Sequence, residues 1–143
     1  MKFHRLHLKN SLEELSFFRD EAEKFIGNSL SSKNRMRVIL SLDEILSNII
    51  EHGFPEKKES FIEAEMTLYP DRIICVFTDE GIPFNPLSAP EVNINEHLDK
   101  GEDGGMGIHI VRKIMKASYE FTSDRKNRLT LIKELKGEDN ENV

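Results

Sequence analysis

The sequence predicts an α+β fold in two layers, a two-layer α/β sandwich in which a largely antiparallel mixed sheet carries helices on one face. Three observations lead to this class. Apolar residues recur at helical spacing in three separate stretches, and they alternate with polar residues in several shorter ones. The two kinds of stretch do not alternate regularly along the chain, which disfavours a doubly wound parallel sheet.

The composition is that of one globular domain in water. The chain has 143 residues, of which 38% are hydrophobic and 32% charged. We expect a single domain over residues 1–136 and a flexible tail over residues 137–143. No apolar run approaches the roughly 20 residues that cross a bilayer, and the alternating N-terminus lacks the apolar core of a secretion signal. We therefore expect a cytoplasmic protein without a membrane partner.

The charge balance argues against direct contact with nucleic acid. The formal net charge is −6, whereas nonspecific nucleic-acid binding relies on a strong positive field. The single cysteine, Cys75, stands in an apolar stretch. We expect it to be a buried small side chain.

The first half of the chain is expected to form one strand and two helices. Residues 3–8 alternate as in a strand with one buried face. Ser11 stands three residues before Glu14, the spacing of a capping box, at the start of the first helical pattern. Ser31 or Ser32 is expected to cap the second helix.

The second half is expected to form two hairpins on either side of a long loop and a helix. Residues 80–104 are rich in proline and glycine, with a short helix expected over residues 91–98. A segment of this length is often functional, and we expect a mobile lid over residues 86–104. A third helical pattern covers residues 108–115. Strand-like stretches cover residues 61–68, 73–78, 118–123 and 129–135.

The second expected helix carries a polar stripe. Glu44, Asn48 and His52 follow one another at four-residue steps, so they share one edge of the helix. A carboxylate there can accept a proton or orient a water, and an amide oxygen one turn later can bind a hard cation such as Mg²⁺. The alternative is a solvated helix edge without chemistry.

Two later motifs suit the binding of a nucleotide. Asp79 directly follows an apolar strand, where a rigid carboxylate can accept a hydrogen bond from an exocyclic amine, and Gly81 allows a close turn. A plain turn is the alternative. Gly104, Gly105 and Gly107 precede a helical pattern, where free backbone N–H groups favour phosphate oxygens. Their spacing is neither that of a dinucleotide-binding motif nor that of a P-loop.

Together and in this order, the three motifs resemble the N, G1 and G2 boxes of the GHKL ATPase superfamily, whose nucleotide site is called the Bergerat fold. Over about residues 1–135 the chain looks most like the small anti-sigma-factor serine kinases and their ATP-binding relatives. The resemblance implies ATP and Mg²⁺ as cofactors. It also implies Asp79 as the partner of the adenine amino group, Asn48 as the Mg²⁺ ligand and Glu44 as the catalytic base.

The same resemblance extends the expected site and shows one departure. The further nucleotide contacts that it implies are Gly81, Gly104, Gly105, Met106, Gly107 and Thr130, the last of them in support of the phosphate loop. His52 is expected to have a structural or lid-contact role. Related kinases commonly carry a lid arginine suited to clamping the γ-phosphate, whereas this chain has Glu102 and Asp103, with Lys100 as the nearest replacement.

The implied function is that of a protein-serine kinase in a partner switch. Such a kinase holds a sigma factor or similar effector and phosphorylates a small antagonist protein of the anti-anti-sigma type. The altered lid favours a second interpretation, a nucleotide-gated binding module without kinase activity, and an ATPase that drives a conformational cycle is a third. Histidine-kinase membership is disfavoured, because the first expected strand begins almost at Met1 and leaves no room for a phosphoacceptor hairpin.

The resemblance also implies a homodimer. Phe3, Leu6 and Leu8 of the first expected strand are the candidate contact residues. Pairing or packing of this strand across a two-fold axis would remove an exposed edge. The alternative is that the strand simply adds to the sheet of its own chain.

Overall fold

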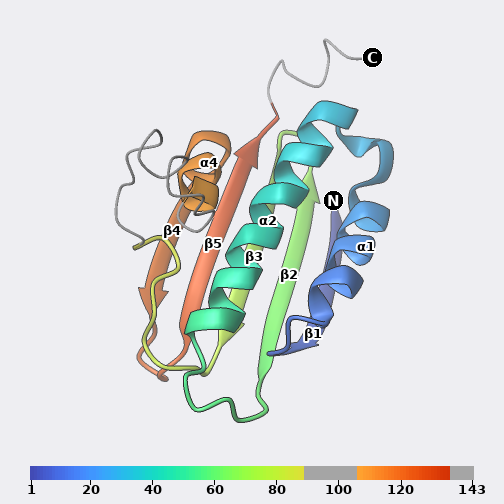
Figure 1. Cartoon of the computed structure of the whole chain (residues 1–143). Coiled ribbons are helices and arrows are strands. Elements are labelled where there is room, and N and C mark those ends of the chain that lie inside the picture. Colours follow the sequence, from blue (N-terminus) through green and yellow to red (C-terminus); the bar gives the residue numbers. More distant parts are fainter. Residues whose placement is uncertain (89–105, 136–143) are drawn as a thin grey trace, which may run out of the picture.

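The computed structural model describes residues 1–88 and 106–135. These residues form a sheet with helices packed on one of its faces, which confirms the expected two-layer α+β class (Figure 1). Most of the expected lid, the short helix expected over residues 91–98 and the expected tail lie outside the described residues.

The described residues contain five strands and three α-helices. The strands are β1 (Lys2–Lys9), β2 (Phe61–Tyr69), β3 (Arg72–Asp79), β4 (Lys116–Phe121) and β5 (Asn127–Glu134). The helices are α1 (Glu14–Ile26), α2 (Ser32–His52) and α4 (Met106–Ile114), with a 3-10 turn at Gly27–Ser29. The strand order is β1-β2-β3-β5-β4, and every pairing among these strands is antiparallel. The described sheet is therefore antiparallel throughout rather than mixed.

One of the two expected helix caps is present. Ser31 caps α2, and its side chain accepts a hydrogen bond from the backbone N–H of Asn34 at 3.1 Å. The capping box at Ser11 is wrong, because α1 begins only at Glu14. The Glu14 carboxylate instead accepts a hydrogen bond from the backbone N–H of Lys9 at 3.1 Å, so it ties the helix to the end of β1.

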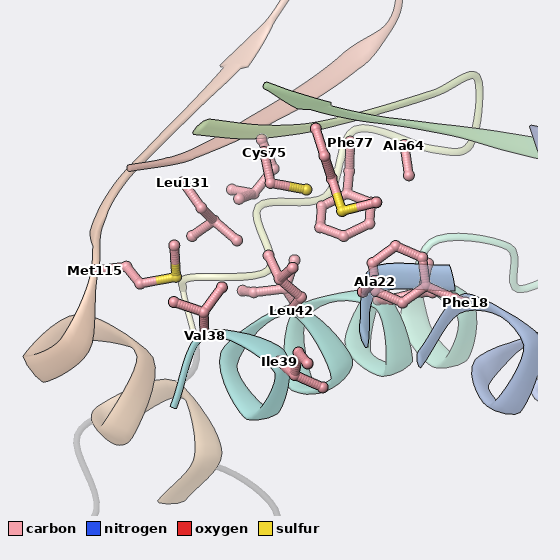
Figure 2. Close-up of a cluster of buried hydrophobic side chains, with 14 of the residues drawn as sticks. Phe18, Ala22, Val38, Ile39, Leu42, Ala64, Cys75, Phe77, Met115 and Leu131 are labelled. Carbon is pink, nitrogen blue, oxygen red and sulfur yellow. The ribbon is translucent and has the colours of Figure 1, made fainter. Parts of the chain in front are cut away.

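The core lies between the sheet and the inner sides of the three helices (Figure 2). Alternate residues of β2 and β3 point toward the helices, and α2 contributes apolar residues at helical spacing. The ring of Phe18 on α1 packs against that of Phe77 on β3, with centroids 5.7 Å apart. Cys75 is buried in this core, as expected. Each large side chain buried here stabilises the fold by about 1.5–3 kcal/mol, which fixes α2 on the sheet.

The opposite face of the sheet is not covered by any helix of the described residues (Figure 1). In β1 this face presents Phe3, which is 52% exposed, whereas Leu6 and Leu8 point into the core and are 6% and 0% exposed. Of these three residues, Phe3 is available for contact with a second copy. The side chains of Leu6 and Leu8 pack in the core of their own chain, and a dimer through β1 stays a prediction.

The helices in the described part of the chain fall short of a membrane span. None of them combines the length and the apolar character that crossing a bilayer requires.

Candidate nucleotide site

The polar stripe of α2 lies along the edge that faces α4 and the loop after β3. Glu44 and Asn48 are half-buried, and His52 is exposed. A Cβ added at Gly107 would overlap the end of the Glu44 side chain, so the first turn of α4 lies directly against this carboxylate. The ring of His52 lies 5.7 Å from that of Phe84, measured between centroids. The stripe therefore extends from α4 to the loop after β3.

The position of Gly107 differs slightly from the expected one. Because α4 begins at Met106, Gly107 is the second residue of the helix rather than part of a loop before it. Its lack of a side chain still has a physical reason. A Cβ here would displace the Glu44 carboxyl group from its position at this crossing of α2 and α4.

Glu44 lies in an environment that favours its neutral form. Burial raises the pKa of its carboxyl group, and the nearby charges of Asp43 and Glu51 raise the pKa further. A carboxylate with a raised pKa is a better proton acceptor near neutral pH. Such perturbed groups are concentrated at functional sites.

Asp79 ends β3 on the helix-covered face and is only 5% exposed. Its Oδ1 accepts hydrogen bonds from the backbone N–H of Gly81 at 2.8 Å and from Nδ2 of Asn127 at 3.0 Å. Its Oδ2 accepts no hydrogen bond from the described residues, so this oxygen can receive an outside donor. Burial raises the pKa of Asp79, and the two hydrogen bonds oppose that rise.

The loop that carries Gly81 packs directly on the end of α2. The backbone N–H of Ile82 donates to the carbonyl of Gly53 at 3.0 Å. A Cβ on Gly81 would collide with the same carbonyl. Only glycine permits this approach, which holds the turn after Asp79 against the helix that carries Glu44.

Asn127 is a site residue that sequence reasoning missed. It is the first residue of β5, lies opposite Asp79 in the strand pairing and is 5% exposed. Both the nitrogen and the oxygen of its side-chain amide make hydrogen bonds. Nδ2 donates to Asp79 Oδ1 at 3.0 Å and to the carbonyls of Gly81 and Ile82 at 3.3 and 2.9 Å. Oδ1 accepts from the backbone N–H of Phe84 at 3.0 Å and from the hydroxyl of Tyr119 at 2.5 Å.

Arg112 is a second residue that sequence reasoning missed. Its guanidinium group donates a hydrogen bond to the backbone carbonyl of Leu87. Leu87 is buried at the end of the described loop, and Arg112 lies in the last turn of α4. This bond joins the helix to the chain that follows β3.

Three of the expected nucleotide contacts are not described at this site, and a fourth lies elsewhere. Gly104 and Gly105 lie outside the described residues, and of Met106 only the backbone position at the start of α4 is described. Thr130 lies on β5, as expected. Because its neighbour Leu129 points into the core, Thr130 points to the uncovered face of the sheet and does not join Asp79.

The fold and the site define a class of protein: a two-layer nucleotide-binding domain with a buried carboxylate at a strand end and a polar helix edge beside it. The comparison of sequences agrees with this class. The chain matches the family described as "Histidine kinase-like ATPase domain" over residues 8–133. It therefore belongs to the histidine kinase-like ATPase domain family, a group within the GHKL ATPases, and membership implies ATP binding.

Two proteins illustrate what the chain is similar to. The serine/threonine-protein kinase BtrW of Bordetella bronchiseptica is 28% identical over 101 residues, which cover 71% of each chain. The solved structure of the Acinetobacter baumannii histidine kinase AdeS is similar with a TM-score of 0.46 and 13% identity, and the match covers 96% of this chain and 70% of that chain.

Proposed function

We propose that this protein is a cytoplasmic ATP-dependent protein-serine kinase of the anti-sigma-factor type, which phosphorylates a small antagonist protein in a partner switch. The observation that carries the proposal is the packing of Glu44 against Gly107 where α2 crosses α4, in a chain of the histidine kinase-like ATPase family. The similarity to a serine/threonine kinase supports a protein as the substrate. A sigma factor or similar effector is the proposed second partner.

The adenine base would bind at Asp79. The Oδ2 of its carboxylate, which accepts no hydrogen bond from the described residues, would accept one from the adenine amino group, while Oδ1 stays bonded to Gly81 and Asn127. The triphosphate would then extend along α2 toward the first turn of α4. This direction passes Asn48 and reaches Glu44 beside Gly107.

Asn48 would bind Mg²⁺ through its amide oxygen. The described residues contain no group of three or more His, Cys, Asp or Glu side chains that could hold a metal alone. Mg²⁺ commonly combines a few protein oxygens with nucleotide phosphates and water, so one amide oxygen on the stripe fits such a site. When bound, the ion would neutralise the charge of the phosphates.

Glu44 would act as the base in phosphoryl transfer. It would take the proton of the substrate hydroxyl as that oxygen attacks the γ-phosphorus of ATP. The bond from the γ-phosphorus to the bridging oxygen would break, and ADP would leave. The remaining contribution of the protein would be positioning and charge stabilisation.

A nucleotide-gated binding module without kinase activity is the second candidate. The observation that favours it is Glu102-Asp103, which stands where related kinases commonly carry a lid arginine. Two carboxylates there would not stabilise the charge of a transferring phosphoryl group. Such a module would bind its partner differently with and without nucleotide.

Transfer of the γ-phosphate distinguishes the two candidates. The protein is incubated with Mg²⁺, γ-labelled ATP and, in turn, each small antagonist-type protein from the same genome. A kinase labels a serine of one antagonist, and Glu44→Gln abolishes labelling while ATP binding remains. Glu59→Gln, which changes an exposed glutamate away from α2, is the matched control and keeps parent activity.

Each other result has a distinct meaning. Partner binding that depends on ATP, without any labelling, would establish the binding module instead of the kinase. Labelling at the parent rate in Glu44→Gln would remove Glu44 from the base role. The absence of ATP binding would overturn both candidates.

A further inference from the structure

We infer that Asn127 is the positioning and specificity-determining residue of the base site: it fixes the Asp79 carboxyl group and thereby decides which nucleobase that group accepts. The inference rests on the proposed adenine site and adds to it a residue outside the three recognised motifs. It is carried by the hydrogen bonds of one buried side chain.

Asn127 joins three separate parts of the chain. Its amide nitrogen holds Asp79 at the end of β3, and the same nitrogen holds the two carbonyls of residues 81 and 82. Its amide oxygen holds the backbone of Phe84 and the hydroxyl of Tyr119 on β4. A buried amide with all of these partners stays in one orientation, because rotation would leave several buried polar groups unpaired.

This fixed amide determines which oxygen of Asp79 is free. Oδ1 receives both Asn127 and the backbone N–H of Gly81, so rotation of the carboxylate would break two hydrogen bonds. Oδ2 accepts no hydrogen bond from the described residues and is therefore the oxygen left to accept one from a ligand. In a site where a base fits by one edge, the choice of oxygen and its direction decide which base is accepted.

The protonation state of Asp79 also decides between adenine and guanine. Adenine carries an amino donor where guanine carries a carbonyl oxygen. An ionised carboxylate accepts from the amino group and repels the carbonyl oxygen, whereas a protonated carboxyl group can donate to that oxygen. The hydrogen bond from Asn127 lowers the pKa of Asp79 against the effect of burial, and so favours the ionised form that selects adenine.

Several charged groups lie across the sheet from the Asp79 side chain. His7 on β1 and Glu63 on β2 belong to the uncovered face, and with Glu80 and Lys126 they line a cavity of about 290 Å³ that Asp79 also borders. Tyr119 on β4 approaches from the other side and is bonded to the far end of the Asn127 amide. Among the described residues, Asn127 supplies the side-chain hydrogen bond that Asp79 accepts.

Calorimetric titration with Mg²⁺-ATP and Mg²⁺-GTP tests the inference, at a series of pH values that begins near the ordinary aspartate pKa of about 3.9 and rises from there. Asn127→Ala should lower ATP affinity about tenfold, the effect of one lost hydrogen bond to a charged group. It should also reduce the preference for ATP over GTP. The pH at which ATP affinity is half lost should rise, because Asp79 loses a bond that favours its charged form.

The control is Arg128→Ala. Arg128 is next to Asn127 on β5, points to the uncovered face and pairs with Glu120 at 3.0 Å. Its replacement disturbs the same strand and should leave the base preference and the pH midpoint unchanged. A purely structural role of Asn127 would lower stability without moving the midpoint.

The other outcomes separate this inference from the proposed function. A parent protein that binds neither nucleotide refutes the proposed function. A parent protein that prefers ATP, with Asn127→Ala showing the parent preference and midpoint, refutes only the role of Asn127. If Asn127→Ala does not fold, Tyr119→Phe decides: removal of one hydroxyl bond to the amide should reduce the ATP preference by a smaller factor, and an unchanged preference overturns the inference.

Discussion

At the scale of single residues, Glu44 and Asp79 share one property. Burial raises the pKa of both carboxyl groups in the free protein. Each charged carboxylate therefore costs free energy of folding that the remainder of the chain must offset. Functional sites commonly carry this kind of local cost, because the groups are placed for chemistry rather than for stability.

Glu44→Gln should stabilise the free protein at neutral pH. The folded-state pKa of Glu44 is raised, so its neutral form favours folding below the unfolded-state pKa, and this contribution is lost as the pH rises through the folded-state pKa. Gln stays neutral at every pH. The melting temperature should therefore increase at pH near 7 and change little at pH near 4. An equal increase at both values, or the same increase in the exposed control Glu59→Gln, would contradict this account.

Gly107→Ala should affect Glu44 rather than the helix. Alanine favours a helix over glycine by up to about 1 kcal/mol, but its Cβ would take the space of the Glu44 carboxylate. In the parent, the variant should reduce phosphoryl transfer about tenfold or more. In a Glu44→Ala background, the same change should raise the free energy of unfolding by up to about 1 kcal/mol. The double-mutant cycle compares the free energy of unfolding of the parent, the two single variants and the double variant. If the effects of Gly107→Ala and Glu44→Ala on this free energy are additive, the contact is disproved.

The sequence could predict the motif residues but not the side chains that support them. Glu44 and Asn48 share one edge of α2 because of their helical spacing, and Gly107 at the start of α4 packs against Glu44 on that edge. Asn127 was missed, because a polar residue before the expected strand start looks like part of a turn. Its function depends on the pairing of β5 with β3, which one-dimensional spacing does not reveal.

At the scale of secondary structure, the faces of the elements were predictable and their ends were not. Burial follows apolar periodicity, so α2 and the strands appear where the pattern indicated. Ends depend on individual hydrogen bonds. The box expected at Ser11 failed for this reason, since the Glu14 carboxylate bonds to the end of β1 instead. Thr130 is an example of a predictable face: strand alternation places it opposite to Leu129, which points into the core.

Arg112 should hold α4 to the loop after β3. Loss of its hydrogen bond to the Leu87 carbonyl in Arg112→Ala should increase amide hydrogen exchange in residues 84–88 and in α4, without exposing the central strands. Lys113→Ala is the matched control, because Lys113 is the next exposed residue of the same helix. Equal exchange in the two variants would show that Arg112 does not join these segments.

At the scale of the whole molecule, the helices cover one face of the sheet and the described residues leave the other face open (Figure 1). We propose that the protein forms a homodimer in which β1, an edge strand of the described sheet, contacts a second copy. Phe3→Glu should convert the dimer to a monomer in sedimentation at micromolar concentration while the fold is kept, because Phe3 is 52% exposed. A parent protein that sediments as a monomer with and without ATP would refute the dimer.

The most direct test of the central claim is calorimetric titration of the parent and Asp79→Asn with Mg²⁺-ATP and Mg²⁺-GTP. The account predicts that the parent binds ATP more tightly than GTP. The substitution should weaken ATP binding by about 1–3 kcal/mol, the range for a lost charge-assisted hydrogen bond in a buried site. Equal affinity of the parent for the two nucleotides, or unchanged ATP affinity in Asp79→Asn, would contradict the assignment of Asp79 as the adenine-binding residue.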